Sequence, residues 1–268
     1  MYDIASPPQD ARGISIRELR AICQSTAPAP ERETFTGKRG ARFFSIYFTK
    51  LFLRTPITPN QITVISVIVF FIGVCLFMTL SRPLAITGAL LVFFATVLDG
   101  CDGEVSRFRR LNNPAGALYV EPVSHDIQYG FMFLPLAVAA FWMTGRPSFL
   151  ILGYLAAIAK AVTRLIENRH WFMTRAEITP QEITKIREDY LKRPAHQRLI
   201  SWFKRNLFTS NGMILPLFVA ALSNRLPLFM IFYAYGYACL LVIIFVKQVR
   251  SFEKAKVVAK QAVPGSAD

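Results

Sequence analysis

The sequence has few of the residues that build a disulfide scaffold or a zinc site. Its four cysteines, Cys23, Cys75, Cys101 and Cys239, lie far apart and form no CxxC pair. This spacing excludes a small disulfide framework and a zinc ribbon, and it predicts four unpaired thiols. The first residues, MYDIASPPQD, also lack a basic segment followed by an apolar core, so no cleaved signal peptide is expected.

Charge is almost absent from several long stretches of the chain. Hydrophobic residues make up 53% of the sequence and include 23 Phe, more than an ordinary soluble core can bury. The first apolar stretch, 62–80, nearly crosses a hydrocarbon layer of ~30 Å at about 1.5 Å per residue. We therefore predict an all-α, polytopic integral membrane protein with six transmembrane helices. The six segments are about 62–80, 84–98, 127–143, 148–162, 211–222 and 226–246.

The basic residues lie where they indicate topology. The formal net charge is +14, yet three short connections hold one arginine each: Arg82 in 81–83, Arg146 in 144–147 and Arg225 in 223–225. The long connections and both termini hold nearly all other Lys and Arg, so they are expected in the cytoplasm by the positive-inside rule. In a bacterium the protein would be a multi-pass protein of the inner membrane. Membrane lipids are the expected partner of the remaining charge, and no nucleic-acid partner is expected.

The same pattern divides the chain into regions, and no internal repeat stands out. In the basic N-terminal region we expect a short helix at 14–24 and an amphipathic, interfacial helix at 38–54. Asn60 is expected to cap the first membrane helix. The predicted regions are 1–55, cytoplasmic and N-terminal; 56–247, the six-helix membrane domain with a basic cytoplasmic connection at 164–208 and a helix-like piece at 180–193; and 248–268, a cytoplasmic tail.

A polar stretch from Asp99 to Asp126 directly follows the second apolar segment. Charge at the edge of a membrane segment is costly unless it has a role. If the second helix continues, Asp99 and Asp102 project from nearly the same face. Two adjacent carboxylates require a cation, and hard oxygen ligands favour Mg²⁺ or Mn²⁺ over Zn²⁺. The spacing therefore predicts a divalent metal site at the membrane–water boundary.

Glycines and arginines close to these acids predict a phosphorylated substrate. Gly100 and Gly103 leave one side of the helix end open, so that a bulky ligand can approach the backbone. Arg107, Arg109 and Arg110 supply positive charge suited to diphosphate oxygens. Metal ions and arginines together indicate a polyanionic substrate.

A second acidic pair lies further along. Glu121 and His125 share a face if they lie on one helix, whereas Asp126 is about 140° from Glu121. Pro122 would preserve this pair if it occupies the first turn of that helix. Glu121 could then complete the metal site, and His125 could accept a proton near neutral pH.

Each of these features also has a simpler interpretation. The aspartates alone could be helix ends in water, the arginines alone topology signals, and His125 alone an interfacial residue. Arg164, near the end of the fourth segment, could contact the phosphate of an acceptor or could reach the membrane surface from an apolar position. The conjunction of acids, glycines and arginines within one short stretch favours a functional site.

The motif DGCDGEVSR, followed by eight residues and Gly116, resembles the signature of the CDP-alcohol phosphotransferase family. That signature begins with DxxDGxxAR. After eight further residues comes a G, and two D residues follow it, each after a gap of three residues. Asp99, Asp102, Gly103, Arg107 and Gly116 match, and Ser106 stands in place of the usual Ala. The TPNQIT at 58–63 is also similar to this family, and the likeness covers roughly 40–250.

The second half of the motif departs from the signature. Val120 occupies the position of the third acid, and Glu121 comes one residue later. The resemblance implies metal ligands at Asp99, Asp102 and Glu121, two bound Mg²⁺ or Mn²⁺ ions, and His125 near the second ion as the base. Asp126 is the alternative base. The positions implied to bind the CDP diphosphate are Asn60, Gly103, Ser106, Arg107 and Gly116.

The resemblance implies an enzyme of phospholipid biosynthesis. Such an enzyme transfers a phosphatidyl or similar group from a CDP-linked lipid donor, such as CDP-diacylglycerol, to an alcohol acceptor and releases CMP. A homodimer is also implied. Two alternatives stay open: a catalytically inactive membrane scaffold of the same fold, for which the irregularity at Val120 speaks, and an ion or solute transporter, which would place ionisable residues near span midpoints.

Overall fold

The chain is helical throughout the part that the structure describes. A computed structural model describes residues 13–24, 40–111, 116–174, 194–209 and 211–262. The α-helices in it are α1 (Ile16–Gln24), α2 (Arg42–Phe52), α3 (Pro59–Cys75), α4 (Arg82–Phe108), α5 (Glu121–Phe131), α6 (Phe133–Thr144), α7 (Ser148–Thr174), α9 (Ala195–Phe208), α10 (Ile214–Ser223) and α11 (Leu226–Ala262). The prediction of an all-α protein is confirmed for these residues.

Within the described residues, five helical segments are long and apolar enough to cross a membrane, as expected of an integral membrane protein. They are Pro59–Thr79, Arg82–Phe108, Glu121–Thr144, Ser148–Ile166 and Leu226–Arg250. The other expected span, 211–222, is a shorter apolar segment, Asn211–Ser223, in which a 3-10 turn precedes α10. The count of six spans and the cytoplasmic side of the termini therefore stay predictions.

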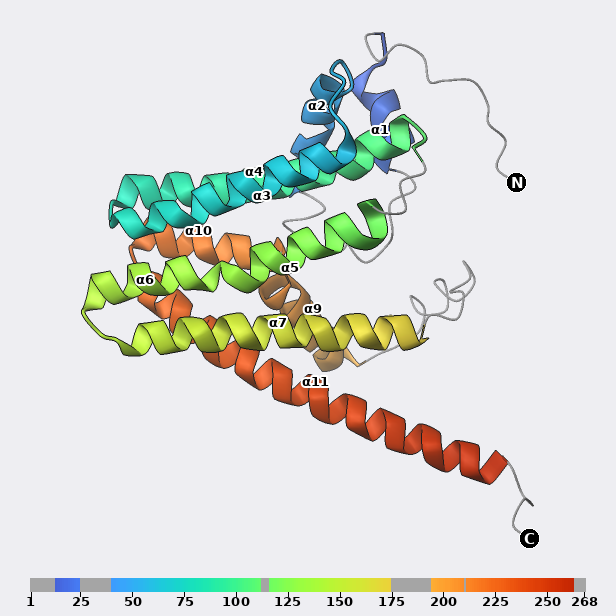
Figure 1. Ribbon diagram of the computed structural model, residues 1–268, viewed down its shortest axis with the longest axis vertical. Coiled ribbons are helices and arrows are strands. Elements are labelled where there is room, and N and C mark those ends of the chain that lie inside the picture. The colour runs from blue at the N-terminus through green and yellow to red at the C-terminus, as the bar shows by residue number, and fades with distance from the viewer. Residues whose placement is uncertain (1–12, 25–39, 112–115, 175–193, 210, 263–268) are drawn as a thin grey trace.

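The helices of the bundle lie side by side, and their connections differ at the two ends (Figure 1). The short connections α3 to α4, α6 to α7 and α10 to α11 lie at one end. At the other end, α1 and α2 pack on the last turns of α4. The motif Asp99–Arg107 lies in these last turns, so the N-terminal helices border the candidate site.

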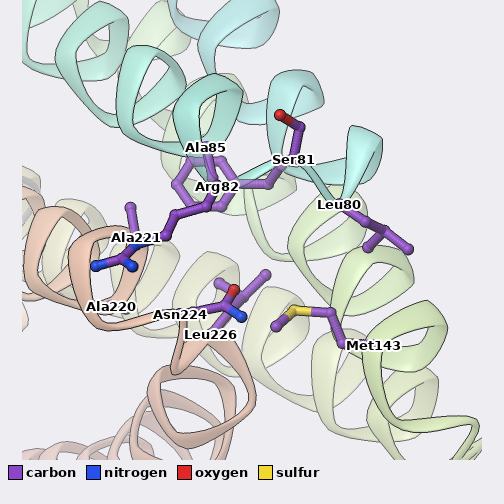
Figure 2. A pocket seen from close by; sticks show the side chains of 10 residues that line it. Leu80, Ser81, Arg82, Ala85, Met143, Ala220, Ala221, Asn224 and Leu226 are labelled. Atoms are coloured by element: carbon purple, nitrogen blue, oxygen red, sulfur yellow. The ribbon is translucent and has the colours of Figure 1, made fainter.

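The three short connections share one construction. In each, a residue with positive φ follows a helix, and an arginine and a proline come next, just before or at the start of the following helix: Leu80, Arg82 and Pro83; Gly145, Arg146 and Pro147; Asn224, Arg225 and Pro227. The left-handed residue turns the chain back, and the proline fits a first helical turn. Figure 2 shows a small pocket where the three turns meet, lined by Ser81, Arg82, Met143 and Asn224 among others. None of the predicted site residues lines it.

The first hairpin, α3 and α4, is closely packed through two glycines. A β-carbon on Gly88 would meet the carbonyl oxygen of Gly73, and one on Gly73 would lie 2.7 Å from the carbonyl oxygen of Gly88. The two backbones therefore touch, which holds the ends of α3 and α4 beside their short connection in a fixed relation.

The expected cap of α3 at Asn60 is wrong. The helix begins at Pro59 and Thr58 caps it: the Gln61 amide donates to Thr58 Oγ1 at 3.3 Å, and the Thr58 amide donates to Gln61 Oε1 at 2.9 Å. This capping box places Pro59 in the first turn, where its missing N–H is not needed. Asn60 instead lines the pocket described below.

The N-terminal helices are where the sequence predicted them. Glu18 accepts from the amide of Ser15 at 3.0 Å, which starts α1. α2 exposes Phe43, Phe44 and Tyr47 on one side; its location at a membrane surface stays a prediction. All four cysteines are unpaired, as expected. The predicted helical piece at 180–193 lies outside the described residues.

Candidate functional site

α4 continues without a break through the whole DGCDGEVSR motif and ends at Phe108. The helix therefore extends past Leu98, where the apolar segment ends. Within it Asp102 is only 6% exposed. One oxygen of its carboxylate accepts from Thr63 Oγ1 of α3, and the other accepts from the Gly103 amide. These two donors offset much of the cost of burying the carboxylate and hold it in one orientation.

A pocket lies between the beginning of α3, the end of α4 and the segment that leads into α5. It is lined by Pro59, Asn60, Thr63, Asp102, Gly103, Ser106, Gly116 and Glu121. Six of these residues are predicted site residues, brought together from three separate parts of the sequence. Gly103 and Gly116 have no side chain there, so a ligand can approach the backbone.

α5 begins at Glu121, with Pro122 in its first turn. The condition for pairing Glu121 with His125 on one helix is therefore met. A π-helical turn, Gly116–Val120, precedes Glu121 and brings the chain back to the pocket. Glu121 lines this pocket, while His125 lies one turn further along α5.

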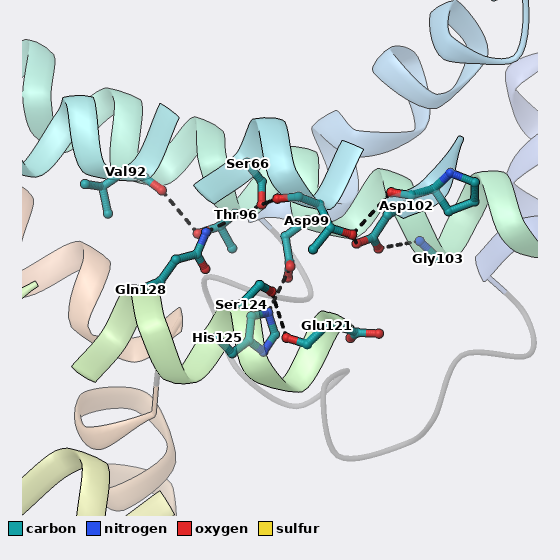
Figure 3. A network of polar contacts seen from close by, with 12 residues as sticks. Ser66, Val92, Thr96, Asp99, Asp102, Gly103, Glu121, Ser124, His125 and Gln128 are labelled. Atoms are coloured by element: carbon teal, nitrogen blue, oxygen red, sulfur yellow. Dashed lines mark hydrogen bonds and ion pairs between the residues drawn. The ribbon is translucent and has the colours of Figure 1, made fainter. Parts of the chain in front are cut away.

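His125 contacts Asp99 directly. Its Nε2 lies 2.8 Å from Asp99 Oδ1, and both side chains are about one-fifth exposed. Figure 3 shows the imidazole on α5 pointing toward α4, with Asp99 and Asp102 on the facing side of that helix. Asp99 and His125 do not line the pocket themselves.

Asp126 faces a different neighbour. Arg164 Nε of α7 donates to Asp126 Oδ1 at 2.8 Å, and the two side chains form an ion pair. Successive residues of α5 thus bind to α4 and to α7. Asp126, the alternative base, therefore already has a cationic partner. Arg164, the possible contact of an acceptor phosphate, already has an anionic partner.

Oxygen ligands for a divalent ion lie at this site. Among the described residues no three His, Cys, Asp or Glu side chains are grouped closely enough to hold an ion by themselves. Asp102 and Glu121 nevertheless line one pocket, and Asp99 precedes Asp102 by one turn. Mg²⁺ is commonly held by one or two carboxylates together with water and substrate phosphate. The residues fit such an open site, and the metal stays a prediction.

The three arginines of the motif lie in different environments. Arg107 Nε donates to the Cys23 carbonyl of α1 at 2.6 Å. Arg109 donates to the carbonyl oxygens of Phe52, Thr55 and Ile57, which fixes the loop between α2 and α3. Arg109 therefore stabilises this loop. The expectation from the sequence, that Arg109 contacts diphosphate oxygens, is not met in the structure. Arg110 follows α4 with φ 50°.

Sequence reasoning missed Glu104, which is completely buried. Its carboxylate accepts from Gln24 at 2.9 Å, from Ser45 at 2.7 Å and from Thr49 at 2.6 Å. Its only sequence signal was a further acid inside the motif, two residues after Asp102. The three donors come from α1 and α2, so the role of Glu104 depends on contacts between helices.

Sequence reasoning also missed Lys160, which is 4% exposed within the Ser148–Ile166 span. Its ammonium lies 3.3 Å from the Phe208 carbonyl oxygen and 4.7 Å from the centre of the Tyr237 ring. Tyr237 also donates to this carbonyl, at 2.9 Å. Lys160 thus satisfies the end of α9 within the bundle. The transporter alternative would instead require an ionisable residue within a span, such as Lys160, to line an ion path.

Comparison with known proteins gives one partial match and no family model. No family model matches the chain. The chain is 36% identical over 67 residues to "Bifunctional IPC transferase and DIPP synthase" of Rubrobacter xylanophilus. The matched residues make up 25% of this chain and 15% of that relative, so the chain spans only a small part of the relative's length.

Proposed function

We propose that the protein is an integral membrane transferase of the CDP-alcohol phosphotransferase kind. It moves a phosphatidyl or similar group from a CDP-linked lipid donor to an alcohol acceptor and releases CMP. The observation that carries the proposal is the pocket in which Asn60, Asp102, Gly103, Ser106, Gly116 and Glu121 meet. The partial likeness to a relative named as a transferase and synthase supports the same kind of reaction.

The pocket suits the diphosphate of the donor. Gly103 and Gly116 admit the phosphates close to the backbone, and Asn60 and Ser106 add polar side chains to the lining. Asp102 and Glu121, with Asp99, would hold one or two Mg²⁺ or Mn²⁺ ions. Such ions neutralise charge on the diphosphate. The acyl chains of the donor remain in the bilayer beside α3 and α4.

His125 is the proposed base. If the Nε2–H donates to Asp99, the other ring nitrogen, Nδ1, has a lone pair that can take a proton. The acceptor hydroxyl gives its proton to His125 and its oxygen attacks the phosphorus nearer the lipid. The bond from this phosphorus to the CMP oxygen breaks, and CMP leaves. Asp99 then stabilises the imidazolium.

The test is CMP release from CDP-diacylglycerol by the purified protein in lipid vesicles, with a panel of glycerol phosphate, inositol phosphate and serine as acceptors. We expect release with one acceptor, loss on adding EDTA, and recovery with Mg²⁺ or Mn²⁺. Asp102→Asn removes a carboxylate without changing its size, and it should abolish release. Thr87→Ala is the matched control: it removes a hydrogen bond to the Pro83 carbonyl in the first turns of α4, far from Asp102. Undiminished turnover by Asp102→Asn would contradict the site.

The inactive scaffold is the second candidate, because Val120 and Ser124 stand where the family signature has its third and fourth acids. Equilibrium binding of CDP in the presence of Mg²⁺ separates the two candidates. A transferase binds CDP and releases CMP. A protein that neither binds CDP nor releases CMP would be a scaffold.

A further inference from the structure

α1 is attached to the candidate site through the side chains of α4. Glu104 projects from α4 toward α1 and α2, away from the Thr63 that holds Asp102. An ionised carboxylate that is completely buried is stable only if its oxygens accept hydrogen bonds. All three of the bonds described above come from α1 and α2. Glu104 therefore anchors both N-terminal helices to the helix that carries the motif.

Gln24 at the end of α1 joins three helices. Its side-chain nitrogen donates to Glu104 Oε1 at 2.9 Å and to the Arg42 carbonyl oxygen, where α2 begins, at 2.8 Å. Both hydrogens of the amide group are thus used. Replacing this amide removes one hydrogen bond from α1 to α4 and one from α1 to α2 at the same time.

The neighbouring residue of α1 holds Arg107. Carbonyl groups in the last turn of a helix lack partners within the helix, and an arginine can satisfy them. The Cys23 carbonyl oxygen accepts from Arg107 Nε at 2.6 Å. Cys23 is completely buried together with Leu19, Ile46 and Phe108. Burial raises the pKa of the Cys23 thiol to about 12, so this thiol stays neutral and unreactive while α1 is docked.

The same arginine does not line the pocket, but it lies beside Gly103, which does. A β-carbon on Gly103 would lie 3.2 Å from one terminal nitrogen of Arg107 and 3.5 Å from the other. The guanidinium therefore lies along the bare side of Gly103, which lines the pocket. Its Nε faces α1 and its terminal nitrogens lie beside Gly103. A guanidinium binds phosphate best when its plane is fixed in advance.

We propose that α1 is a positioning element of the active site: Gln24 and Glu104 dock it, and its Cys23 carbonyl orients the Arg107 guanidinium toward the diphosphate of the nucleotide. This inference rests on the proposed function. Gln24 and Glu104 are positioning residues that act through Arg107, and neither touches the nucleotide. α1 thereby contributes to nucleotide affinity although none of its residues lines the pocket.

The test is a double-mutant cycle on equilibrium binding of CDP with Mg²⁺ to the full-length protein in vesicles. Gln24→Ala removes the docking amide. Arg107→Lys keeps the charge but removes the Nε that Cys23 holds. If Gln24 acts through Arg107, Gln24→Ala weakens CDP binding about tenfold in the wild type and less than about twofold when Arg107→Lys is present. Thr87→Ala is the control and should not alter binding.

Two further measurements separate positioning from a loss of structure. Glu104→Gln keeps the volume of the buried side chain and should weaken CDP binding in the same direction. Labelling of Cys23 by a water-soluble maleimide, mapped by mass spectrometry, should rise in both variants, because the thiol is buried only while α1 is docked. With turnover as readout, Gln24→Ala should raise KM for the donor and leave kcat within about twofold.

The outcomes distinguish the two proposals. An equal loss of CDP binding by Gln24→Ala in both backgrounds, or no loss while Cys23 becomes labelled, would overturn the positioning role and leave the proposed transferase intact. A wild type that neither binds CDP nor releases CMP would overturn both.

Discussion

Nε2 of His125 lies 2.8 Å from Oδ1 of Asp99, and this contact joins α5 to α4 across 26 positions of the sequence. Asp126, the next residue of α5, pairs instead with Arg164 of α7. The two candidates for the base are therefore in opposite situations. His125 is oriented by a carboxylate, whereas Asp126 is held in an ion pair with Arg164.

The first prediction compares these two residues. His125→Ala should lower the rate of CMP release by roughly a hundredfold or more, since it removes the group that takes the acceptor proton. Asp126→Asn keeps an acceptor for Arg164 and should have a much smaller effect. Single-turnover release of CMP at saturating donor is the measurement. A larger loss in the Asp126 variant would make Asp126 the base.

The second prediction concerns the hydroxyl that holds Asp102. Thr63→Val keeps the shape of the side chain and removes the donor to Asp102. We expect the Mg²⁺ concentration for half-maximal CMP release to rise about tenfold, as is usual when a group that orients a metal ligand is removed. Thr96→Val is the control, because Thr96 Oγ1 donates to the Val92 carbonyl of its own helix. Equal Mg²⁺ dependence in both variants would argue against an ion at Asp102.

The third prediction concerns the packing of the first hairpin. Gly88→Ala adds a methyl group where a β-carbon would meet the Gly73 carbonyl oxygen, so α3 and α4 must separate. The free energy of unfolding should fall by about 1–3 kcal/mol. Gly130→Ala on α5 is the control, since no atom lies within 4 Å of the β-carbon it would add. Thermal unfolding in detergent measures both, and equal midpoints would contradict the close contact.

The fourth prediction concerns topology. Ser223→Cys lies in a short turn, and Ser266→Cys lies near the C-terminus of the sequence. In sealed inner-membrane vesicles of native orientation, an impermeant maleimide should label Ser223→Cys from the outer side, and should label Ser266→Cys only after the membrane is opened. Mass spectrometry distinguishes these sites from the native cysteines. The reverse pattern would place the proposed site outside the cytoplasm.

Properties of single helices could be predicted from the sequence. Helical spacing places Asp99 and Asp102 one turn apart, and it pairs Glu121 with His125 once Pro122 stands in the first turn. The predicted cap of α3 is wrong because the side chains of Thr58 and Asn60 both suit an N-cap position. Only the reciprocal bonds between Thr58 and Gln61 decide between them.

Contacts between helices could not be predicted in this way. An arginine in the sequence shows its charge but not its partner, and Arg109 is bound to three carbonyl oxygens of a neighbouring loop. A single acid such as Glu104 carries no periodic signal at all. Its importance follows from donors on α1 and α2 that are distant in the sequence.

Every residue that lines the candidate pocket lies between Pro59 and Glu121. Among the described residues, none of α7, α9, α10 or α11 lines this pocket, and Arg164 of α7 pairs with Asp126 of α5 nearby. If the proposed function holds, nucleotide recognition would be a property of the first hairpin and the segment after it. In that case a chimaera that keeps this module and takes its later spans from a relative is expected to retain CDP binding.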